Sequence, residues 1–337
     1  MKARNSLINF HSTIWALICL LLTNCTTLEN NKVLSYGEII LSITSEKQTL
    51  KSLNPDEEKI SNINILVFNH NNILENNIYL NVSELESTAD GYIKDLNLIL
   101  NKNYSFFVIA NLGYKLEVNT MEELKDYRYY LSYPDEFSEG IPMSAYIEDV
   151  LIKEGVEVEI SLERLMGKIS LCFDRSGLDP DVDLFVTSIQ LMVSPKSVLI
   201  FGENRVKNKF EAFTAGYYKE GLQVEDINYS SNDKKSGYIS LYALENIQGD
   251  LLSGNIDYSL KKFPLDDYRE KLCSHIEICI DYTKEGGKAG KLYYRYYLGE
   301  SASDFSIKRN THYKICIKPL GDGLNKNDWL VEVADEL

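Results

Sequence analysis

The chain has 337 residues, a length that suits two domains, and a formal net charge of −15 at pH 7. Such an acidic chain repels phosphate backbones, which argues against nucleic acid as a partner. The same charge disfavours electrostatic docking on anionic lipid, so any membrane attachment has to come from a covalently bound lipid.

The first 24 residues have the composition of a secretory signal. Lys2 and Arg4 supply a positive start, and an uncharged apolar run follows at 14–22. That run is shorter than the roughly 20 residues that a membrane-spanning helix needs. We therefore predict that residues 1–24 are a signal peptide. Its removal takes the two cations away and changes the net charge from −15 to −17.

The end of this segment, Leu22-Thr23-Asn24-Cys25, is similar to a lipobox, in which a cysteine thiol receives a diacylglyceryl group after export. Asn24 departs from the small residue that is usual before the cysteine. A lipid on Cys25, palmitate among its acyl chains, would anchor the protein in the outer membrane, and residues 25–35 would be a polar tether. The alternative is a simple secreted protein with an incidental cysteine.

Alternation of apolar and polar residues predicts short strands along most of the remaining chain. The predicted strands are 39–44, 60–68, 104–111, 156–162, 168–173, 184–193, 238–242, 275–282, 292–298, 312–318 and 329–333. Helical signal is confined to short stretches such as 120–130, where Thr120 can cap and Glu123 can complete a capping box. The pattern predicts an all-β protein built of β-sandwiches, with domains at 36–165 and 166–337.

Four cysteines lie outside the export segment: Cys172, Cys273, Cys279 and Cys316. No C-x-x-C pair is present, and no histidine lies at zinc-ligand spacing from these cysteines. We expect buried free thiols, with one Cys279–Cys316 disulfide on neighbouring strands as the alternative.

Catalytic and ligand motifs are absent or incomplete. No G-x-S-x-G elbow occurs, and the glycine-rich stretch at 284–291 is one residue too short for a P-loop. The acidic turn at 179–183 lacks the glycine and the distal glutamate of a calcium loop. We therefore predict no enzyme activity, no cofactor and no metal site. The tyrosine-rich stretches at 127–133 and 293–297 are expected to fill a sandwich core and its rim rather than to stack on glycans.

Several short motifs occur in a fixed order along the chain. They are Ile-Asn-Ile-Leu-Val-Phe-Asn at 63–69, a strand ending in Ala110-Asn111, Ile141-Pro142-Met143, an L-x-R-x-x-G-K-I segment at 162–169, Leu244-Glu245-Asn246, Leu298-Gly299, the segment 309–313 and Asp328-Trp329. Together they resemble the fimbrillin superfamily of Bacteroides-like bacteria, although Gly167 stands where alanine is usual.

This resemblance implies two tandem transthyretin-like β-sandwich domains and a structural subunit of a cell-surface pilus that supports adhesion. The implied partners are other fimbrial subunits, the outer membrane through the lipid, and host glycan or protein. In the family, subunits join by strand exchange after a protease removes the first strand, so that a neighbour's strand adds to the open sheet edge. The alternative is a surface lipoprotein of the same fold that binds glycan or host protein.

The segment 36–44 alternates as a removable first strand should, with Ile39, Leu41 and Ile43 on one face. These three residues are the predicted strand-exchange segment.

Cleavage after this strand would need a suitable basic residue. No arginine occurs between Arg4 and Arg128, which leaves Lys47, Lys51 and Lys59 for a lysine-accepting protease. This favours an anchor or accessory subunit that keeps its lipid, with a tip subunit as the open alternative.

Arg164 and Lys168 flank the predicted domain boundary. We expect both cations to pair with carboxylates or carbonyls where the two sandwiches meet, and to act structurally.

Overall fold

The structure is a computed structural model, and it describes residues 34–45, 57–89, 91–131, 140–213, 227, 234–264 and 266–324. The predictions on the signal peptide, Cys25, Lys47, Lys51 and the strand at 329–333 lie outside the described residues. Within the described ranges, no helix is long and apolar enough to cross a membrane.

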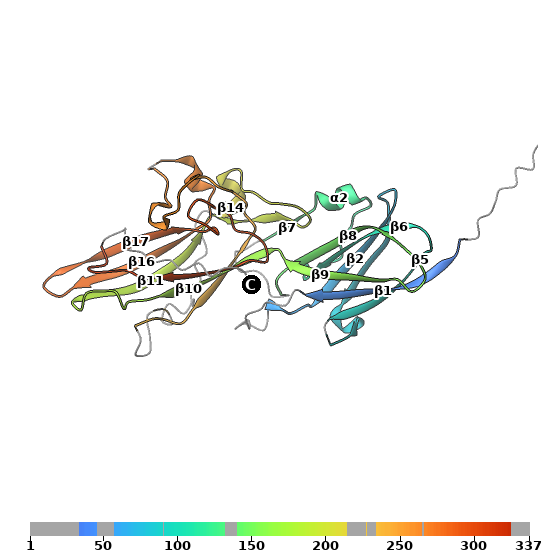
Figure 1. The fold of residues 1–337 in the computed structure, drawn as a ribbon, viewed down its shortest axis with the longest axis horizontal. Coiled ribbons are helices and arrows are strands. Elements are labelled where there is room, and N and C mark those ends of the chain that lie inside the picture. The colour runs from blue at the N-terminus through green and yellow to red at the C-terminus, as the bar shows by residue number, and fades with distance from the viewer. Residues whose placement is uncertain are drawn as a thin grey trace, which may run out of the picture.

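The described residues are almost entirely β-structure, which confirms the predicted fold class (Figure 1). The strands are β1 (Tyr36–Ser45), β2 (Asn62–Asn69), β3 (Leu74–Asn81), β4 (Glu86–Ser87), β5 (Tyr92–Ile99), β6 (Asn103–Ala110), β7 (Arg128–Tyr130), β8 (Met143–Leu151), β9 (Glu157–Arg164), β10 (Met166–Phe173), β11 (Val182–Met192), β12 (Ser194–Pro195), β13 (Ser197–Leu199), β14 (Ala212–Phe213), β15 (Ile239–Leu244), β16 (His275–Lys284), β17 (Lys288–Tyr297) and β18 (His312–Ile317).

The helices are short: α2 (Met121–Lys125) and the 3-10 turns η2 (Val82–Glu84), η3 (Lys209–Glu211), η4 (Tyr258–Leu260) and η5 (Tyr268–Lys271). Helix α2 is shorter than the stretch predicted from the sequence, because β7 begins three residues after it. The Thr120 hydroxyl caps α2 by accepting from Glu123 N (3.2 Å), as predicted. The Glu123 carboxylate accepts from Asn119 N (2.7 Å) and not from the cap residue, so the predicted capping box is wrong in this detail.

The N-terminal sandwich consists of the strands in the order β3-β2-β6-β8-β9-β1-β5-β4. Strands β8 and β9 pair over only two residues each, so the sheet folds there into two halves that face each other. Inward side chains from both halves, such as Ile65 and Phe106 on one and Leu41 and Ile160 on the other, share one buried core.

The C-terminal sandwich consists of the sheets β15-β10-β18 and β11-β16-β17, with a second core between them. Strand β9 ends at Arg164 and β10 begins at Met166, where the sequence predicts a domain boundary. The division into domains 36–165 and 166–337 stays a prediction. The two sandwiches lie end to end in an elongated molecule (Figure 1).

A third apolar cluster joins the two sandwiches. It contains Leu66 and Phe107 from the outer face of the N-terminal sheet, and Val198 and Phe201 from the chain after β10. The rings of Phe107 and Phe201 meet edge to face, with centroids 4.9 Å apart. Both faces of β2 and β6 are buried, so these two strands expose almost no side chain to solvent.

The four cysteines outside the export segment are free thiols. Cys172 on β10 lies opposite Cys316 on β18, whereas Cys279 on β16 belongs to the other sheet. The alternative prediction of a Cys279–Cys316 disulfide is therefore wrong, because the two cysteines do not lie on neighbouring strands. The hydrogen bond with Cys316 and burial raise the pKa of the Cys172 thiol, which keeps it protonated and unreactive.

Candidate functional site

The first strand, β1, lies inside the N-terminal sandwich rather than at its edge. It pairs antiparallel with β5 and parallel with β9. The structure brings Ile39, Leu41 and Ile43 together on the inward face, and each is 0% exposed, whereas Ile40 between them is 41% exposed. The predicted strand-exchange residues are thus the buried face of this strand.

Removal of β1 would open a long apolar groove. The strands on either side, β5 and β9, would each lose their main-chain partners along β1. The side chains left without cover would include Leu96 and Leu98 on β5 and Val158 and Ile160 on β9. A groove with two open edges and an apolar floor can accept another strand of similar pattern.

After β1, the described chain resumes at Glu57, which reaches the C-terminal sandwich. Its side chain is 1% exposed, and its carboxylate accepts from Lys168 Nζ on β10 (2.9 and 3.1 Å) and from the Tyr242 hydroxyl on β15. Its carbonyl accepts from Arg164 Nε (3.1 Å). The segment that follows the first strand is therefore held by both sandwiches.

Arg164 extends this junction to the loop before β18, where its Nη1 donates to Asn310 Oδ1 (3.1 Å). The prediction that Arg164 and Lys168 lie at the junction and pair with carbonyls or carboxylates is confirmed. Sequence reasoning missed Glu57 as their partner, because nothing in its local pattern marks it as buried.

Lys59, one of the predicted processing residues, has an exposed side chain but a fixed backbone. Its carbonyl accepts from Asn111 Nδ2 (2.8 Å), and Asn111 Oδ1 accepts from Ser61 N (2.8 Å). Asn111 has a φ of 64°, a conformation that asparagine tolerates better than most residues. At Gly140 (φ 101°), an added Cβ would lie 2.7 Å from the Lys59 carbonyl and 2.6 Å from Asn111 Nδ2, so only glycine fits there.

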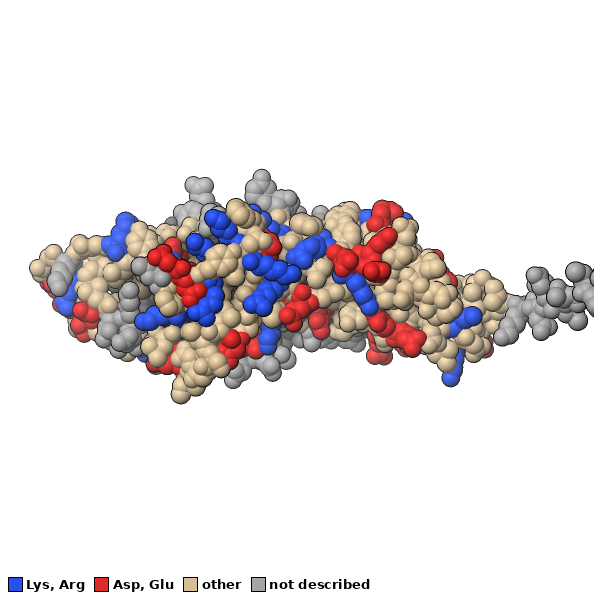
Figure 2. Space-filling model, turned by 90° about the horizontal axis from the view of Figure 1, so that it is seen from above, with Lys and Arg blue, Asp and Glu red and all other residues tan. Residues whose placement is uncertain are grey.

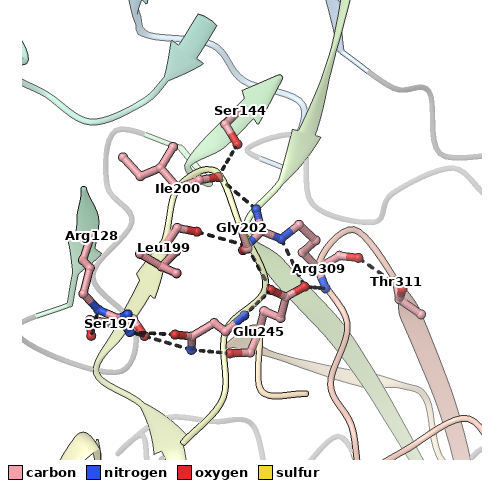
Figure 3. Close-up of polar contacts among 10 residues, drawn as sticks. Arg128, Ser144, Ser197, Leu199, Ile200, Gly202, Glu245, Arg309 and Thr311 are labelled. Carbon is pink, nitrogen blue, oxygen red and sulfur yellow. Dashed lines mark hydrogen bonds and ion pairs between the residues drawn. The ribbon is translucent and has the colours of Figure 1, made fainter. Parts of the chain in front are cut away.

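A second polar cluster lies where the loop before β18 meets the segment that follows β13 (Figure 3). The Arg309 guanidinium binds the Glu245 carboxylate, with 2.9 Å from Nη2 to Oε1, and also donates to the carbonyls of residues 199, 200 and 202. Ser144 Oγ on β8 donates to the same Ile200 carbonyl (2.9 Å), so the N-terminal sandwich takes part in this cluster.

The short strands β7 and β13 form a ribbon across the same junction. Arg128 on β7 donates to Ser197 Oγ (3.0 Å) and to Asn204 Oδ1 (2.6 Å). Motifs that the sequence shows only as a resemblance, at 244–246 and 309–313, thus supply residues that hold the segment 199–202, which the N-terminal sandwich contacts through Ser144.

Two buried histidines make the fold sensitive to acid. Burial lowers the pKa of His275 to about 4, and its Nδ1 donates to the Cys273 carbonyl (3.0 Å). Burial, followed by the charges of Lys168 and Lys314, lowers the pKa of His312 to about 4; Glu57 opposes this shift, and His312 Nε2 lies 2.7 Å from Ser170 Oγ.

We expect the free energy of unfolding to fall as the pH drops from 6.5 to 4. Each histidine is neutral in the folded protein across this window but binds a proton on unfolding, so its contribution is present above pH 6.5 and is lost through pH 4. The slope is at most about 1.4 kcal/mol per pH unit for each histidine. Urea unfolding at several pH values measures it. His275→Gln should reduce the slope.

Comparisons with known proteins agree with this architecture. Residues 38–168, from the third residue of β1 to the start of β10, match the family model of the major fimbrial subunit protein (FimA). Over these residues the N-terminal sandwich therefore resembles a fimbrillin domain. The resemblance to the fimbrillin superfamily is confirmed, and it implies a structural role with other fimbrial subunits in a cell-surface fimbrium. Residues 241–317 match a family described as a domain of unknown function (DUF4906).

Solved structures share the fold of this chain over both sandwiches. The tip fimbrial protein Mfa3 from Porphyromonas gingivalis, truncated at its C-terminus, is 11% identical, with 89% of this chain and 99% of that chain covered and a TM-score of 0.55. A candidate cell adhesion protein from Parabacteroides distasonis is 11% identical, with coverages of 90% and 100% and a TM-score of 0.57. The fimbrilin FimA from P. gingivalis is 14% identical, with coverages of 85% and 90% and a TM-score of 0.52. The comparison with curated proteins gave no match.

Proposed function

We propose that this fimbrillin is a lipid-anchored accessory subunit that keeps its first strand and holds a fimbrium to the outer membrane. The observation that carries the proposal is the place of β1 between β5 and β9, with its three alternate apolar residues fully buried. A groove that is filled by the chain's own strand has no room for the strand of a neighbour. Such a subunit joins other subunits through other surfaces and ends the filament.

The backbone around Lys59 supports retention of β1. A protease binds several residues on each side of the cleaved bond in an extended conformation, which requires local opening. Here Glu57 is buried against Lys168, and the Lys59 carbonyl is held by Asn111. Strand removal at Lys59 would therefore have to break the junction first.

We expect a lysine-specific protease to leave the bond after Lys59 uncut in the native protein and to cut it after denaturation. Mass spectrometry of the fragments over time measures this. Asn111→Ala removes the side chain that binds the Lys59 carbonyl and should make the native bond susceptible. Equal cleavage after Lys59 in native and denatured protein would contradict the proposed protection.

The lipid at Cys25 is the second part of the proposal, and it rests on the order of charged, apolar and lipobox-like residues at the N-terminus. Cys25→Ala is expected to abolish incorporation of labelled palmitate and to release the protein from the membrane fraction. Each buried CH₂ of the acyl chains contributes about 0.8 kcal/mol, so two or more chains suffice for stable attachment. Cys172→Ala is the control and should leave labelling unchanged. Labelling that persists in Cys25→Ala would refute the lipid anchor.

The function as a whole is tested on the producing cells. Deletion of the protein should release fimbriae from the cell surface or weaken their attachment to it, and negative-stain microscopy would show this. Protein recovered from membranes should begin at the lipidated Cys25 and retain residues 36–45. A dominant filament-associated form that begins after Lys47, Lys51 or Lys59 would replace the anchor assignment with that of a polymerising or tip subunit. An unchanged filament population would contradict the pilus role itself.

A further inference from the structure

A basic cleft of about 550 Å³ lies beside the β7–β13 ribbon, where the segment 203–211 passes over it. Four cations line it, Arg128, Lys196, Arg205 and Lys207, against the two carboxylates of Glu203 and Glu211. Lys and Arg side chains gather near the middle of the face seen in Figure 2, the side on which β7 and β14 lie in Figure 1. In a chain of net charge −15, this local excess of positive charge stands out.

The segment 203–207 presents its cations from a fixed backbone. Inward and outward residues alternate along it. Asn204 and Val206 point inward and are 3% and 2% exposed, whereas Arg205 and Lys207 are exposed. Asn204 Nδ2 donates to the Ser197 carbonyl (3.1 Å), and Val206 N donates to Asn246 Oδ1 (3.0 Å). A ligand that binds here would meet cations whose supporting chain is already ordered.

Two aromatic rings border the cleft and face solvent. Tyr130 on β7 is 67% exposed and Phe210 on η3 is 75% exposed, although Tyr129 beside them is buried. The sequence predicted that the stretch 127–133 fills the sandwich core and its rim; Tyr129 is buried and Tyr130 lies on the exposed rim. Exposed rings on ordered backbone next to cations provide flat apolar surfaces on which a sugar ring can lie.

The charges of the cleft are only partly neutralised within the chain. The Glu211 carboxylate accepts from Lys207 N (2.8 Å) and Asn208 Nδ2 (2.5 Å), and Lys196 Nζ donates to the Phe210 carbonyl (3.1 Å). Among the residues that the structure describes, the Arg205 guanidinium makes one long hydrogen bond, from Nε to Gln248 Oε1 (3.3 Å). Arg205 and Lys207 are thus the cations best placed to bind an incoming anion.

We propose that this cleft binds an acidic saccharide of a few rings, through its carboxylate or sulfate groups on Arg205 and Lys207 and a ring face on Phe210 or Tyr130. The volume lies within the range of about 300–1,000 Å³ that is usual for small-ligand sites. An acidic peptide lacks the flat ring faces that the exposed aromatics fit. The inference rests on the proposed function only in requiring that the protein is displayed at the cell surface.

Isothermal titration calorimetry of the mature chain tests this with three probes of similar length: a sulfated heparin tetrasaccharide, a galacturonate tetrasaccharide and neutral cellotetraose. We expect one or both acidic probes to bind, with an affinity that falls as salt is raised, and the neutral probe to bind at least tenfold more weakly. The double variant Arg205→Ala/Lys207→Ala should weaken binding at least tenfold, and Phe210→Ala at least about threefold.

The control variant Lys102→Ala/Lys115→Ala removes two exposed cations of the N-terminal sandwich and should leave binding unchanged. Unfolding midpoints of all variants should match that of the wild type, which separates lost binding from lost folding. Absence of binding to both acidic probes overturns the proposal, as does binding that the cleft variants do not weaken. Equally tight binding of tetraglutamate would assign the cleft to acidic peptides instead. None of these outcomes tests filament attachment, so the proposed role in assembly is tested separately.

Discussion

Lys168→Ala is expected to lower the free energy of unfolding by about 3–5 kcal/mol, a large share of the stability of a typical domain. The reason lies in Glu57, which is 1% exposed and whose two carboxylate oxygens accept from Lys168 Nζ at 2.9 and 3.1 Å. Without that ammonium group, the Glu57 carboxylate loses this ion pair in a site that is closed to solvent, next to the Tyr242 hydroxyl. Urea unfolding followed by circular dichroism measures the change in the free energy of unfolding.

A matched control is available on the surface. Lys291 Nζ lies 2.7 Å from Asp281 Oδ1, a distance as short as that of the buried pair, but the two side chains are 57% and 51% exposed. Lys291→Ala should therefore change the stability by less than about 1 kcal/mol. The double variant Glu57→Gln/Lys168→Met removes both charges and should recover part of the loss. Equal effects of Lys168→Ala and Lys291→Ala would show that Glu57 is not buried as described.

The second large effect is expected at the first strand, where Leu41→Ala should cost about 2–5 kcal/mol. Leu41 is 0% exposed and packs in the core between the two halves of the N-terminal sheet, so its loss leaves a cavity that the surrounding strands cannot close. Ile40→Ala, one residue away on the outward face, removes a side chain that is 41% exposed and should cost less than about 1 kcal/mol. Similar losses for both variants would contradict a fixed inward face for β1.

Leu41→Ala also tests whether β1 can be exchanged. Weaker packing of this strand should raise the exchange of its amide hydrogens more than that of β10 in the other sandwich. An added synthetic peptide of residues 36–45 should then enter the groove in the variant and not in the wild type. Protection of β1 that stays at the wild-type level would show that Leu41 does not hold the strand in place.

The sequence predicts strands best where burial alternates. In β1 and β9 every second residue is buried, and the predicted positions coincide with the observed ones. Strands β3, β5 and β8 were missed because polar residues interrupt the pattern. Strand β3 carries three asparagines among its eight residues, and one of them, Asn77, uses its side chain to bind the Leu116 carbonyl (2.7 Å) rather than to face solvent.

The candidate site was predictable in part. The inward face of β1 follows from period-two alternation alone, which is a local property of the chain. The partners at the junction are not local: Glu57 and Lys168 are 111 residues apart, and Arg309 binds carbonyls more than 100 residues earlier. Backbone carbonyls leave no signature in the sequence. A motif such as 309–313 can therefore be recognised from the sequence, but the carbonyls that it binds cannot be predicted.

The direction of β1 determines how the subunit would carry load. With the lipid at Cys25, as proposed, tension on a filament enters the folded part at Tyr36 and runs along β1, which lies roughly parallel to the long axis of the molecule (Figure 1). The ladder bonds to β5 and β9 lie across the strand, so such a pull shears all of them at once instead of opening them one after another. Forced unfolding is limited by the rate of barrier crossing and not by equilibrium stability. A strand that is hydrogen-bonded on both sides and loaded in shear therefore suits a subunit that anchors a filament under tension.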